Sequence, residues 1–426
     1  MINSTHGAAN IHGVLSESAI RETVAALLDE IARDARKILL IVPDGTRTAP
    51  VGKMFRTIHE LLKNRAKLDV MIALGTHEPM SDREIDARLE ISPRERDTIF
   101  RDTQFFNHAW DDKSQLQSVG VIPQSEIETL SRGAFCQDVE VHINKRVFDY
   151  DCLLILGPVF PHEVAGFSGG NKYLFPGIGG PEILNFFHWL GAVVTNPKII
   201  GHKHTPVRAV IDRAAQMVPV KKACLAMTVR TDGNLAALYG GTPEAAWEKA
   251  ADVSAQIHVI EKDAPFQTVL ACAPPMYRDL WTGGKCMYKL ESVVADGGEL
   301  IIYAPHIREV SSVHGAWLEK IGYHTRDYFL ANWEKFKDVP WGVLAHSTHV
   351  RGVGEMQNGS EKPRIRVTLA TQISEEVCRQ INMGYRDPQT INIEDFANRE
   401  NENILLVRKA GEVLYRLKDA PHWAQG

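Results

Sequence analysis

A lysine and two histidines stand in a glycine-rich stretch, residues 161–191, whose composition suggests a site for chemistry. The stretch holds seven glycines, with Lys172 after Gly169, Gly170 and Asn171; His162 precedes the lysine by ten residues and His188 follows it by sixteen. Glycines this dense imply unusual backbone dihedrals or close approach of the backbone to another group. The apolar residues between them argue against a flexible linker. The pattern therefore predicts a compact cavity around the lysine amine.

Lys172 has three interpretations that the residues leave open. Apolar walls would destabilise its ammonium form, which favours a nucleophilic amine and covalent chemistry. It could instead be a surface lysine after a turn, or a lysine that binds a phosphate. The surrounding glycines do not follow the GxxxxGK[ST] spacing, so a P-loop is not indicated.

Histidines supply the second set of candidate groups. His77 lies in the sequence Gly-Thr-His-Glu-Pro directly after a strand-like run, and His162 also follows such a run. A single histidine is more often structural, but two imidazoles at one sheet edge suggest an acid and base pair or a metal site. His188 lies in an apolar, helix-like run, where a histidine is usually a core residue and less often a ligand.

Charged residues near these positions suggest an anionic substrate. Asp44 and Arg47 lie in the sequence Pro-Asp-Gly-Thr-Arg, where they form either an ion pair that caps a helix or a site for carboxylate recognition. Lys285 follows two glycines in the loop beyond another strand and adds a second positive charge for a carboxylate or phosphate.

The elements that must position these groups follow an alternating pattern. Apolar runs at residues 37–42, 68–74 and 151–157 predict buried parallel strands, and helical periodicity appears at 18–36 and 51–65. Each run ends in a loop that holds candidate groups. This is the rhythm of a doubly wound α/β sheet, in which ligands bind at the carboxyl ends of the strands.

A second α/β unit is predicted after residue 262. Strands are expected at 268–273 and 299–304, with a helix at 289–295 between them. The predicted division is an N-terminal domain, 1–262, with the lysine and the histidines, and a C-terminal domain, 263–426, which contributes Lys285. Late strands at 404–408 and 413–416 could return to the first domain.

Composition excludes several classes of function. The chain has 426 residues, is 44% hydrophobic and has a net charge of −5, which gives no reason to expect nucleic acid or an anionic membrane as a partner. The six cysteines are far apart and form no CxxC, so we expect neither a zinc ribbon nor a disulfide framework. No apolar run has the length of a membrane span, and a cytoplasmic location is expected. A homo-oligomer is a possible assembly.

Taken together, these residues resemble the lactate racemase family of nickel-pincer 2-hydroxyacid racemases and epimerases. The resemblance runs through most of the chain and rests on an ordered set: Asp44-Gly-Thr-Arg47, Gly75-Thr-His77, His162, Gly169-Gly-Asn-Lys172, Pro176-Gly177, His188 and Lys285. It implies two α/β domains with mainly parallel sheets and an active site in the cleft between them.

The resemblance also implies roles for these positions. The cofactor would be a nickel pyridinium-3,5-bisthiocarboxylic acid mononucleotide, attached covalently at Lys172, with nickel held by His188. His77 and His162 would be the acid and base pair. Asp44, Arg47 and Lys285 would contact substrate or cofactor. The implied reaction inverts the C2 stereocentre of a 2-hydroxyacid by transient hydride transfer to the cofactor through a 2-keto acid, and cofactor-maturation enzymes are implied as partners.

One departure from the family pattern concerns the substrate. The family's lactate racemases have a Tyr-Gln pair on the substrate side, where this chain has Trp281 and Thr282. A pocket of different shape is therefore expected, suited to a larger hydroxyacid such as a sugar acid.

Two other functions compete with this interpretation. A lysine Schiff-base lyase or aldolase would use Lys172 without a metal. A non-catalytic binding protein would hold a phosphorylated small molecule in the glycine-rich loop and use the histidines structurally. Neither alternative explains why the lysine and three histidines should gather at one sheet edge.

Overall fold

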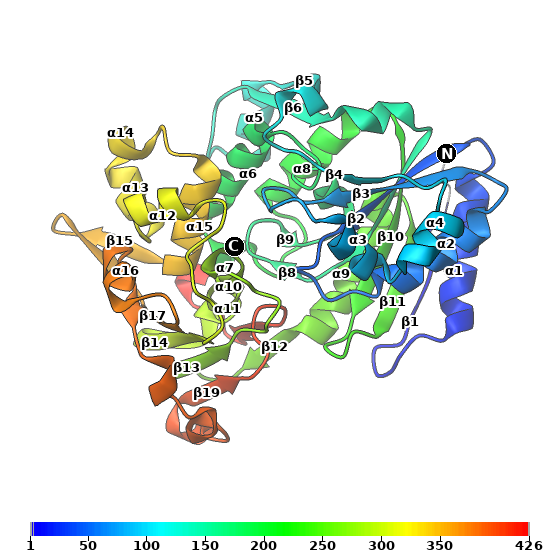
Figure 1. Cartoon of the computed structure of the whole chain (residues 1–426). Coiled ribbons are helices and arrows are strands. Elements are labelled where there is room, and N and C mark those ends of the chain that lie inside the picture. Colours follow the sequence, from blue (N-terminus) through cyan, green and yellow to red (C-terminus); the bar gives the residue numbers. More distant parts are fainter. Residues whose placement is uncertain (1, 3, 425–426) are drawn as a thin grey trace. The chain divides into compact units, whose positions relative to one another are not determined.

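The computed structural model describes residues 2 and 4–424, and these form two compact units. The first unit comprises residues up to Phe160, Phe167–Leu184 and Arg208–Ile257, and the second comprises Pro161–Gly166, Asn185–Val207 and residues from His258 onward. The fold is mixed α/β with mainly parallel sheets, as predicted (Figure 1). Among the described residues, no helix has the length and apolar character needed to cross a membrane.

The first unit contains a seven-stranded sheet in the order β1-β11-β10-β7-β2-β3-β4. Neighbours from β10 to β4 are parallel, and only the pairs with β11 are antiparallel. Its strands are β1 (His6–Ala9), β2 (Lys37–Pro43), β3 (Lys67–Ala73), β4 (Phe105–Asn107), β7 (Cys152–Pro158), β10 (Lys221–Val229) and β11 (Leu235–Gly241). The three strands that the sequence predicted are thus adjacent and parallel, and their carboxyl ends share one edge.

Helices connect these strands, because parallel neighbours need a crossover. They are α1 (Glu17–Ile31), α2 (Val51–Leu62), α3 (Asp82–Leu89), α4 (Pro93–Thr98), α5 (Gln124–Leu130), α8 (Pro206–Gln216) and α9 (Pro243–His258); β5 (Leu116–Ile122) and β6 (Val139–Asn144) form a separate antiparallel pair. α3 and α4 begin at capping boxes, in which Ser81 and Ser92 accept from Glu84 and Glu95 backbone N–H groups while those glutamates bond back.

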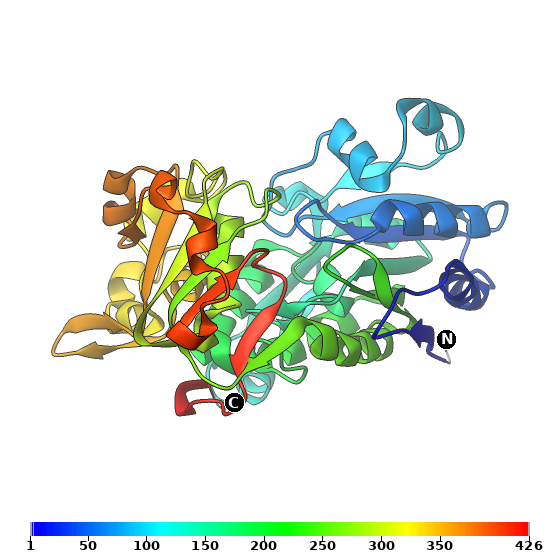
Figure 2. The ribbon, with the colours of Figure 1, turned by 90° about the horizontal axis from the view of Figure 1, so that it is seen from below.

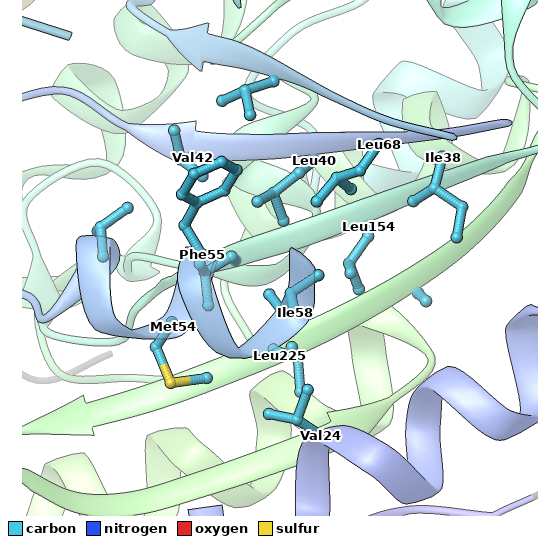
Figure 3. Close-up of a cluster of buried hydrophobic side chains, with 14 of the residues drawn as sticks. Val24, Ile38, Leu40, Val42, Met54, Phe55, Ile58, Leu68, Leu154 and Leu225 are labelled. Carbon is cyan, nitrogen blue, oxygen red and sulfur yellow. The ribbon is translucent and has the colours of Figure 1, made fainter. Parts of the chain in front are cut away.

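The core of the first unit lies between α1, α2 and the sheet. Successive side chains of β2 point to opposite faces of the sheet, so Ile38, Leu40 and Val42 share one face and pack in the same buried cluster as Phe55. Figure 3 shows Phe55 on the side of α2 that faces β2. This packing fixes the direction of β2 and therefore the position at which the loop after its carboxyl end begins.

The second unit contains a five-stranded parallel sheet in the order β18-β17-β14-β13-β19. Its strands are β13 (Phe266–Cys272), β14 (Val294–Ala304), β17 (Arg366–Thr371), β18 (Gly384–Tyr385) and β19 (Ile404–Val407). A second, two-stranded parallel sheet pairs β12 (Val259–Lys262) with β20 (Leu414–Leu417). The hairpin β15 (Gly354–Gln357) and β16 (Ser360–Pro363) extends away from the larger sheet (Figure 2).

The helices of the second unit are mostly short. They are α7 (Asn196–Ile199), α10 (Leu280–Gly283), α11 (Lys285–Tyr288), α12 (Gly315–Ile321), α13 (Arg326–Ala331), α14 (Trp333–Phe336), α15 (Trp341–Arg351) and α16 (Glu375–Gln380). α6 (Pro181–Val194) begins in the first unit and continues into the second.

Three sequence predictions differ from this fold. The helix expected at 289–295 is wrong: α11 ends at Tyr288, and β14 already begins at Val294. Short apolar runs do not distinguish helix from strand, and β-branched Val293 and Val294 favour the strand. The suggested return of the late strands to the first domain is also wrong, because β19 pairs with β13 and β20 with β12.

The third difference is the division of the chain. The predicted boundary near residue 262 lies close to the change of unit at His258, but residues 161–166 and 185–207 belong to the second unit rather than the first. His162 and His188 are therefore in the second unit, while Asp44, His77 and Lys172 are in the first.

We predict that Phe55→Ala lowers the free energy of unfolding of the first unit by about 3–5 kcal/mol, because a fully buried ring is replaced by a cavity. Urea denaturation followed by far-UV circular dichroism would measure the change. Exposed Glu22→Ala on α1 is the control and should stay within about 0.5 kcal/mol of wild type. An equal effect of both changes would contradict this account of the core.

Candidate active site

An aspartate and a histidine pair at the carboxyl ends of two adjacent strands. Asp44 follows β2 directly, and His77 lies four residues beyond the end of β3. The His77 Nδ1 atom is hydrogen-bonded to Asp44 Oδ2. The Thr46 backbone N–H and hydroxyl both donate to Asp44 Oδ1, at 3.0 and 2.7 Å. Parallel pairing of Pro43 with Ala73 places the two loops side by side, so this contact depends on the sheet.

The charge state of Asp44 follows from these contacts. Burial by itself would raise the pKa of the Asp44 carboxyl, but the charge and hydrogen bond of His77, together with Thr46, hold that pKa well below its usual range. The carboxylate can only accept, so His77 Nδ1 is the donor. In the neutral ring Nε2 then carries the lone pair, which is the state of a base oriented by an acid partner. The His77 side chain is 31% exposed, so its ring edge is accessible.

Open space adjoins this pair. A Cβ added at Gly45 would meet nothing within 4 Å, and one added at Gly75 would meet only the Pro176 ring, at 4.0 Å. The Gly75 N–H donates to the Gly177 carbonyl at 3.1 Å. That bond joins the loop of His77 to the segment that contains Lys172. The first unit therefore brings the Asp44–His77 pair and the Lys172 segment to one edge of its sheet.

Lys172 lies in a short 3-10 turn, η3 (Gly170–Tyr173), that is held from several sides. Gly169 and Gly170 have φ of 86° and 58°, a region that favours glycine, and side chains there would clash with Val159 and Trp247. Asn171 donates to Asp212 and Glu244 at 3.0 and 2.7 Å. The Lys172 side chain itself is half-buried. Contacts on several sides therefore fix its backbone.

Tyr173 and two arginines surround Asp44 in the first unit. Burial raises the pKa of the Tyr173 phenol against the charges of Arg47 and Arg88, which lower it. Burial lowers the pKa of Arg88 against the charge of Asp44, and Arg88 Nε donates to the Pro43 carbonyl at 3.2 Å. Arg47 therefore lies near Tyr173, and its role in binding a carboxylate stays a prediction. Arg88 was not predicted, because its place on α3 looks like a solvated helix face.

His162 belongs to the second unit, in β8 (Pro161–His162), and is buried. Its Nδ1 accepts from the backbone N–H groups of Val164 and Ala165, at 3.1 and 3.4 Å. A neutral ring so held has its hydrogen on Nε2 and is a donor there. The Glu163 carboxylate, 3.4 Å from Nδ1, would favour a proton on that atom instead. Two amide hydrogens directed at Nδ1 outweigh it, since a protonated Nδ1 would repel both.

Lys289 fixes the backbone beside His162. Its buried ammonium donates to the Pro161 carbonyl and, at 3.5 Å, to the Glu412 carbonyl. Charged donors make the stronger hydrogen bonds, and a buried ammonium without them would be costly. Sequence reasoning missed this lysine, because no local pattern shows that residues 128 positions apart are in contact.

His188 lies on α6 and stacks on Phe187, with ring centroids 4.8 Å apart. Its charge is among those that lower the pKa of His346 on α15, although burial is the largest cause. Trp281 stacks on His346 at 4.1 Å and contacts His314 at 4.4 Å between ring centroids. The helical setting predicted for His188 is confirmed, and the histidine-rich wall around Trp281 is an additional feature of the second unit.

Thr282 and Lys285 are both buried in the second unit. The Thr282 hydroxyl contacts Asp279 Oδ1 at 2.8 Å, and its backbone N–H donates to the same oxygen, so Asp279 caps α10. Lys285 begins α11 rather than lying in a loop, and its Nζ lies 4.9 Å from the Tyr277 ring centroid. No group of three or more potential metal ligands occurs within residues 2 and 4–424.

Comparisons with known proteins agree with this architecture. Residues 8–199 match the model of the lactate racemase N-terminal domain. The lactate racemase of Thermoanaerobacterium thermosaccharolyticum is 23% identical over 298 residues, which is 68% of this chain and 63% of that protein. The lactate racemase of Lactiplantibacillus plantarum is 24% identical over 312 residues, 70% of this chain and 68% of that protein. The match thus spans under two thirds of the first relative.

Two solved structures have the same fold. A crystal structure of a Thermotoga maritima protein is 32% identical, with a TM-score of 0.87, and the match covers 95% of this chain and 99% of that one. The lactate racemase apoprotein of T. thermosaccharolyticum is 19% identical, with a TM-score of 0.71, and the match covers 96% of this chain and 95% of that one.

The Asp44 interactions predict a pH-dependent contribution to stability. A depressed pKa in the folded state stabilises the fold above the unfolded value near 4 and ceases to do so as the pH falls through the folded pKa. We expect Asp44→Asn to cost about 1–3 kcal/mol at pH 7 and progressively less from about pH 5 to pH 2. Urea unfolding across this range is the measurement, with exposed Asp97→Asn as the control. A cost for Asp44→Asn that does not depend on pH would contradict the ion pair.

Proposed function

We propose that this chain is a member of the lactate racemase family and an isomerase that inverts the C2 stereocentre of a 2-hydroxyacid, because residues 8–199 match that family's N-terminal domain and two lactate racemases are 23% and 24% identical to it. The observation that carries the proposal is the pairing of His77 with a buried, ionised Asp44 beside the segment of Lys172. Inversion through a 2-keto acid needs a base for the hydroxyl proton, which is released as the hydride leaves C2, and a fixed attachment point for the group that takes the hydride. The first unit offers both at one sheet edge.

His77 is the base in this proposal. Asp44 fixes its ring with Nδ1 as the donor, so Nε2 is the atom that accepts the substrate's hydroxyl proton. The nearby carboxylate stabilises the imidazolium that forms, as an orienting acid does for a catalytic histidine. The open space at Gly45 and Gly75 leaves room for a substrate next to the ring.

His162 is the second acid and base group. With Nδ1 accepting from two backbone amides, its hydrogen is on Nε2, and we assign to that hydrogen the donation to the oxygen of the planar 2-keto acid. Lys289 keeps the Pro161–His162 backbone in place. The two enantiomers present their hydroxyl groups differently, so the proposal assigns one enantiomer's hydroxyl proton to each histidine.

The residues present suit the proposed cofactor. Lys172 has a fixed backbone and a half-buried side chain next to glycines that no larger residue could replace, and we assign the covalent attachment of the cofactor to its amine. His188 would be the single protein ligand of nickel. When bound, a nickel pyridinium-3,5-bisthiocarboxylic acid mononucleotide would supply a transient acceptor for the hydride from C2.

Substrate orientation is assigned to the cations and to Trp281. Arg47 and Lys285 would hold the carboxylate while the carbonyl turns. The Trp281 ring is packed against His346 and His314, and the Thr282 hydroxyl is hydrogen-bonded to Asp279. These two side chains therefore differ in shape and in polarity from the Tyr-Gln pair of the family's lactate racemases. This wall supports a 2-hydroxyacid larger than lactate, such as a sugar acid, and enzymes that make the cofactor are the proposed partners.

We predict that His77→Gln and His162→Gln each lower racemisation by about 10²–10⁴-fold in protein matured with nickel and the cofactor-making enzymes. Each variant loses a proton carrier while retaining a polar side chain. Polarimetry or chiral chromatography on a panel of 2-hydroxyacids from lactate to aldonates would measure the rates. Exposed His12→Gln is the control and should match wild type. Wild-type rates in either active-site variant would end that assignment.

We also predict that inversion in deuterated water proceeds without deuterium at C2, because the same hydrogen returns to the carbon. Mass spectrometry of the product after partial turnover tests this, and mass analysis of the Lys172 peptide from the same active sample should show an added cofactor. A Lys113→Ala control should keep the modification. Deuterium at C2 would exclude hydride return, and a borohydride-trapped keto acid on an otherwise unmodified Lys172 would favour the Schiff-base lyase.

A further inference from the structure

The second unit contains a cavity of about 550 Å³ that none of the residues used above lines. It lies at the carboxyl ends of α6 and α15, beside α7, and it is bounded by the base of the β15–β16 hairpin and by Trp423. Its volume is that of a site for a small molecule. It differs from an ordinary surface depression because Thr195, Asn196 and His349, which line it, have buried polar atoms with no hydrogen-bond partner among residues 2 and 4–424.

Asn196 provides the first of these atoms. The side chain is 3% exposed, and its Nδ2 donates to the Tyr288 carbonyl at 3.0 Å and to Glu291 Oε2 at 3.4 Å. A carbonyl can only accept, so the amide nitrogen must be on that side and Oδ1 on the other. Asn196 Oδ1 is buried and has no hydrogen-bond partner among the described residues. A buried acceptor of this kind is costly unless a ligand donates to it.

Two neighbouring side chains repeat the pattern. His349 is 4% exposed, and its Nε2 has no hydrogen-bond partner in the described part of the chain. Burial lowers the pKa of His349 to about 4, so the ring is neutral near neutral pH. Thr195 Oγ1 is also buried without a partner within the described ranges, and its backbone has φ of 84°, which is strained for a β-branched residue. Strain of this kind concentrates at binding sites.

Acidic and basic side chains both line the cavity. Glu291 is fully buried at the inner end, where Oε1 accepts from the Val353 N–H at 2.6 Å. With Asn196 Oδ1, this makes the inner end rich in acceptors. Lys198 and Lys362 line the cavity and are exposed, and so are Asp296, which pairs with Arg364 at 3.0 Å, and Glu355, which accepts from Gln357 Nε2. A ligand that suits both ends has hydroxyl donors at one end and an anionic group at the other.

We propose that this cavity binds a small polyhydroxylated anion, a sugar acid or a sugar phosphate, through Asn196, Thr195 and His349 inside and Lys198 and Lys362 outside. None of the residues that line this cavity is assigned to the proposed active site, and the proposal does not depend on the proposed reaction. The carboxylate and the phosphate share the chemistry that the rim recognises, and the experiment separates them.

Isothermal titration calorimetry on the purified full chain, without maturation, is the test. Gluconate and glucose 6-phosphate are the probes; sorbitol, which lacks the anion, and inorganic phosphate, which lacks the hydroxyl chain, are the comparisons. At least one probe should bind more tightly than both comparison compounds, and the tighter probe identifies the anion. Absence of binding by both probes up to about 10 mM, a Kd limit too weak for a built site, would overturn the proposal.

Variants locate the binding. Thr195→Val keeps the shape and removes the hydroxyl, and we expect it to weaken binding about three- to tenfold, whereas Thr195→Ser should retain it. Lys362→Gln should lower the affinity for the anionic probe and leave the affinity for sorbitol unchanged. Arg47→Gln, in the first unit, should leave this binding unchanged. Binding lost in Arg47→Gln and kept in Thr195→Val would belong to the proposed active site and would contradict the cavity. Unchanged thermal melting of Thr195→Val excludes misfolding as the cause.

Discussion

A carboxylate buried at the end of a strand is the constraint on which the first unit's site depends. Asp44 lies where desolvation would neutralise it, and it stays ionised because His77 and Thr46 donate to it. His77 comes from the next strand, so the pair exists only while β2 and β3 stay parallel and in register. The apolar cluster under β2 therefore supports the chemistry as well as the stability, because it fixes the edge where both loops begin.

The second unit also contains a buried charged group that hydrogen bonds compensate, but there the charge is positive. The ammonium of Lys289 is buried and is compensated by backbone carbonyls, one of them directly before His162. Backbone amides in turn define the tautomer of that histidine. In each unit, hydrogen bonds to Nδ1 determine which ring nitrogen of a histidine carries the hydrogen, and the tautomers of His77 and His162 differ. One presents a lone pair, and the other presents a hydrogen.

Local patterns predicted the elements better than their partners. The runs that form β2, β3 and β7 are continuous and apolar, and a polar loop follows each of them, so the sequence predicted them as buried strands. The predicted helix after Lys289 failed because a run of a few apolar residues fits either period. The late strands were recognised, but their sheet was not, because pairing between β19 and β13 joins residues more than 130 positions apart. Arg88 and Lys289 gave no local signal at all.

The sequence by itself determined the α/β class, the strand-to-loop positions of Asp44 and His77, and the glycine-shaped turn around Lys172, since these follow from hydrophobic period and from residues that only certain backbones accept. Only the tertiary structure decided that residues 161–191 are shared between two units, with Lys172 in one and both His162 and His188 in the other. A segment belongs to the unit with which it makes most of its contacts, and these contacts are with residues far away in the sequence. The composition of a short stretch therefore does not predict the unit to which it belongs.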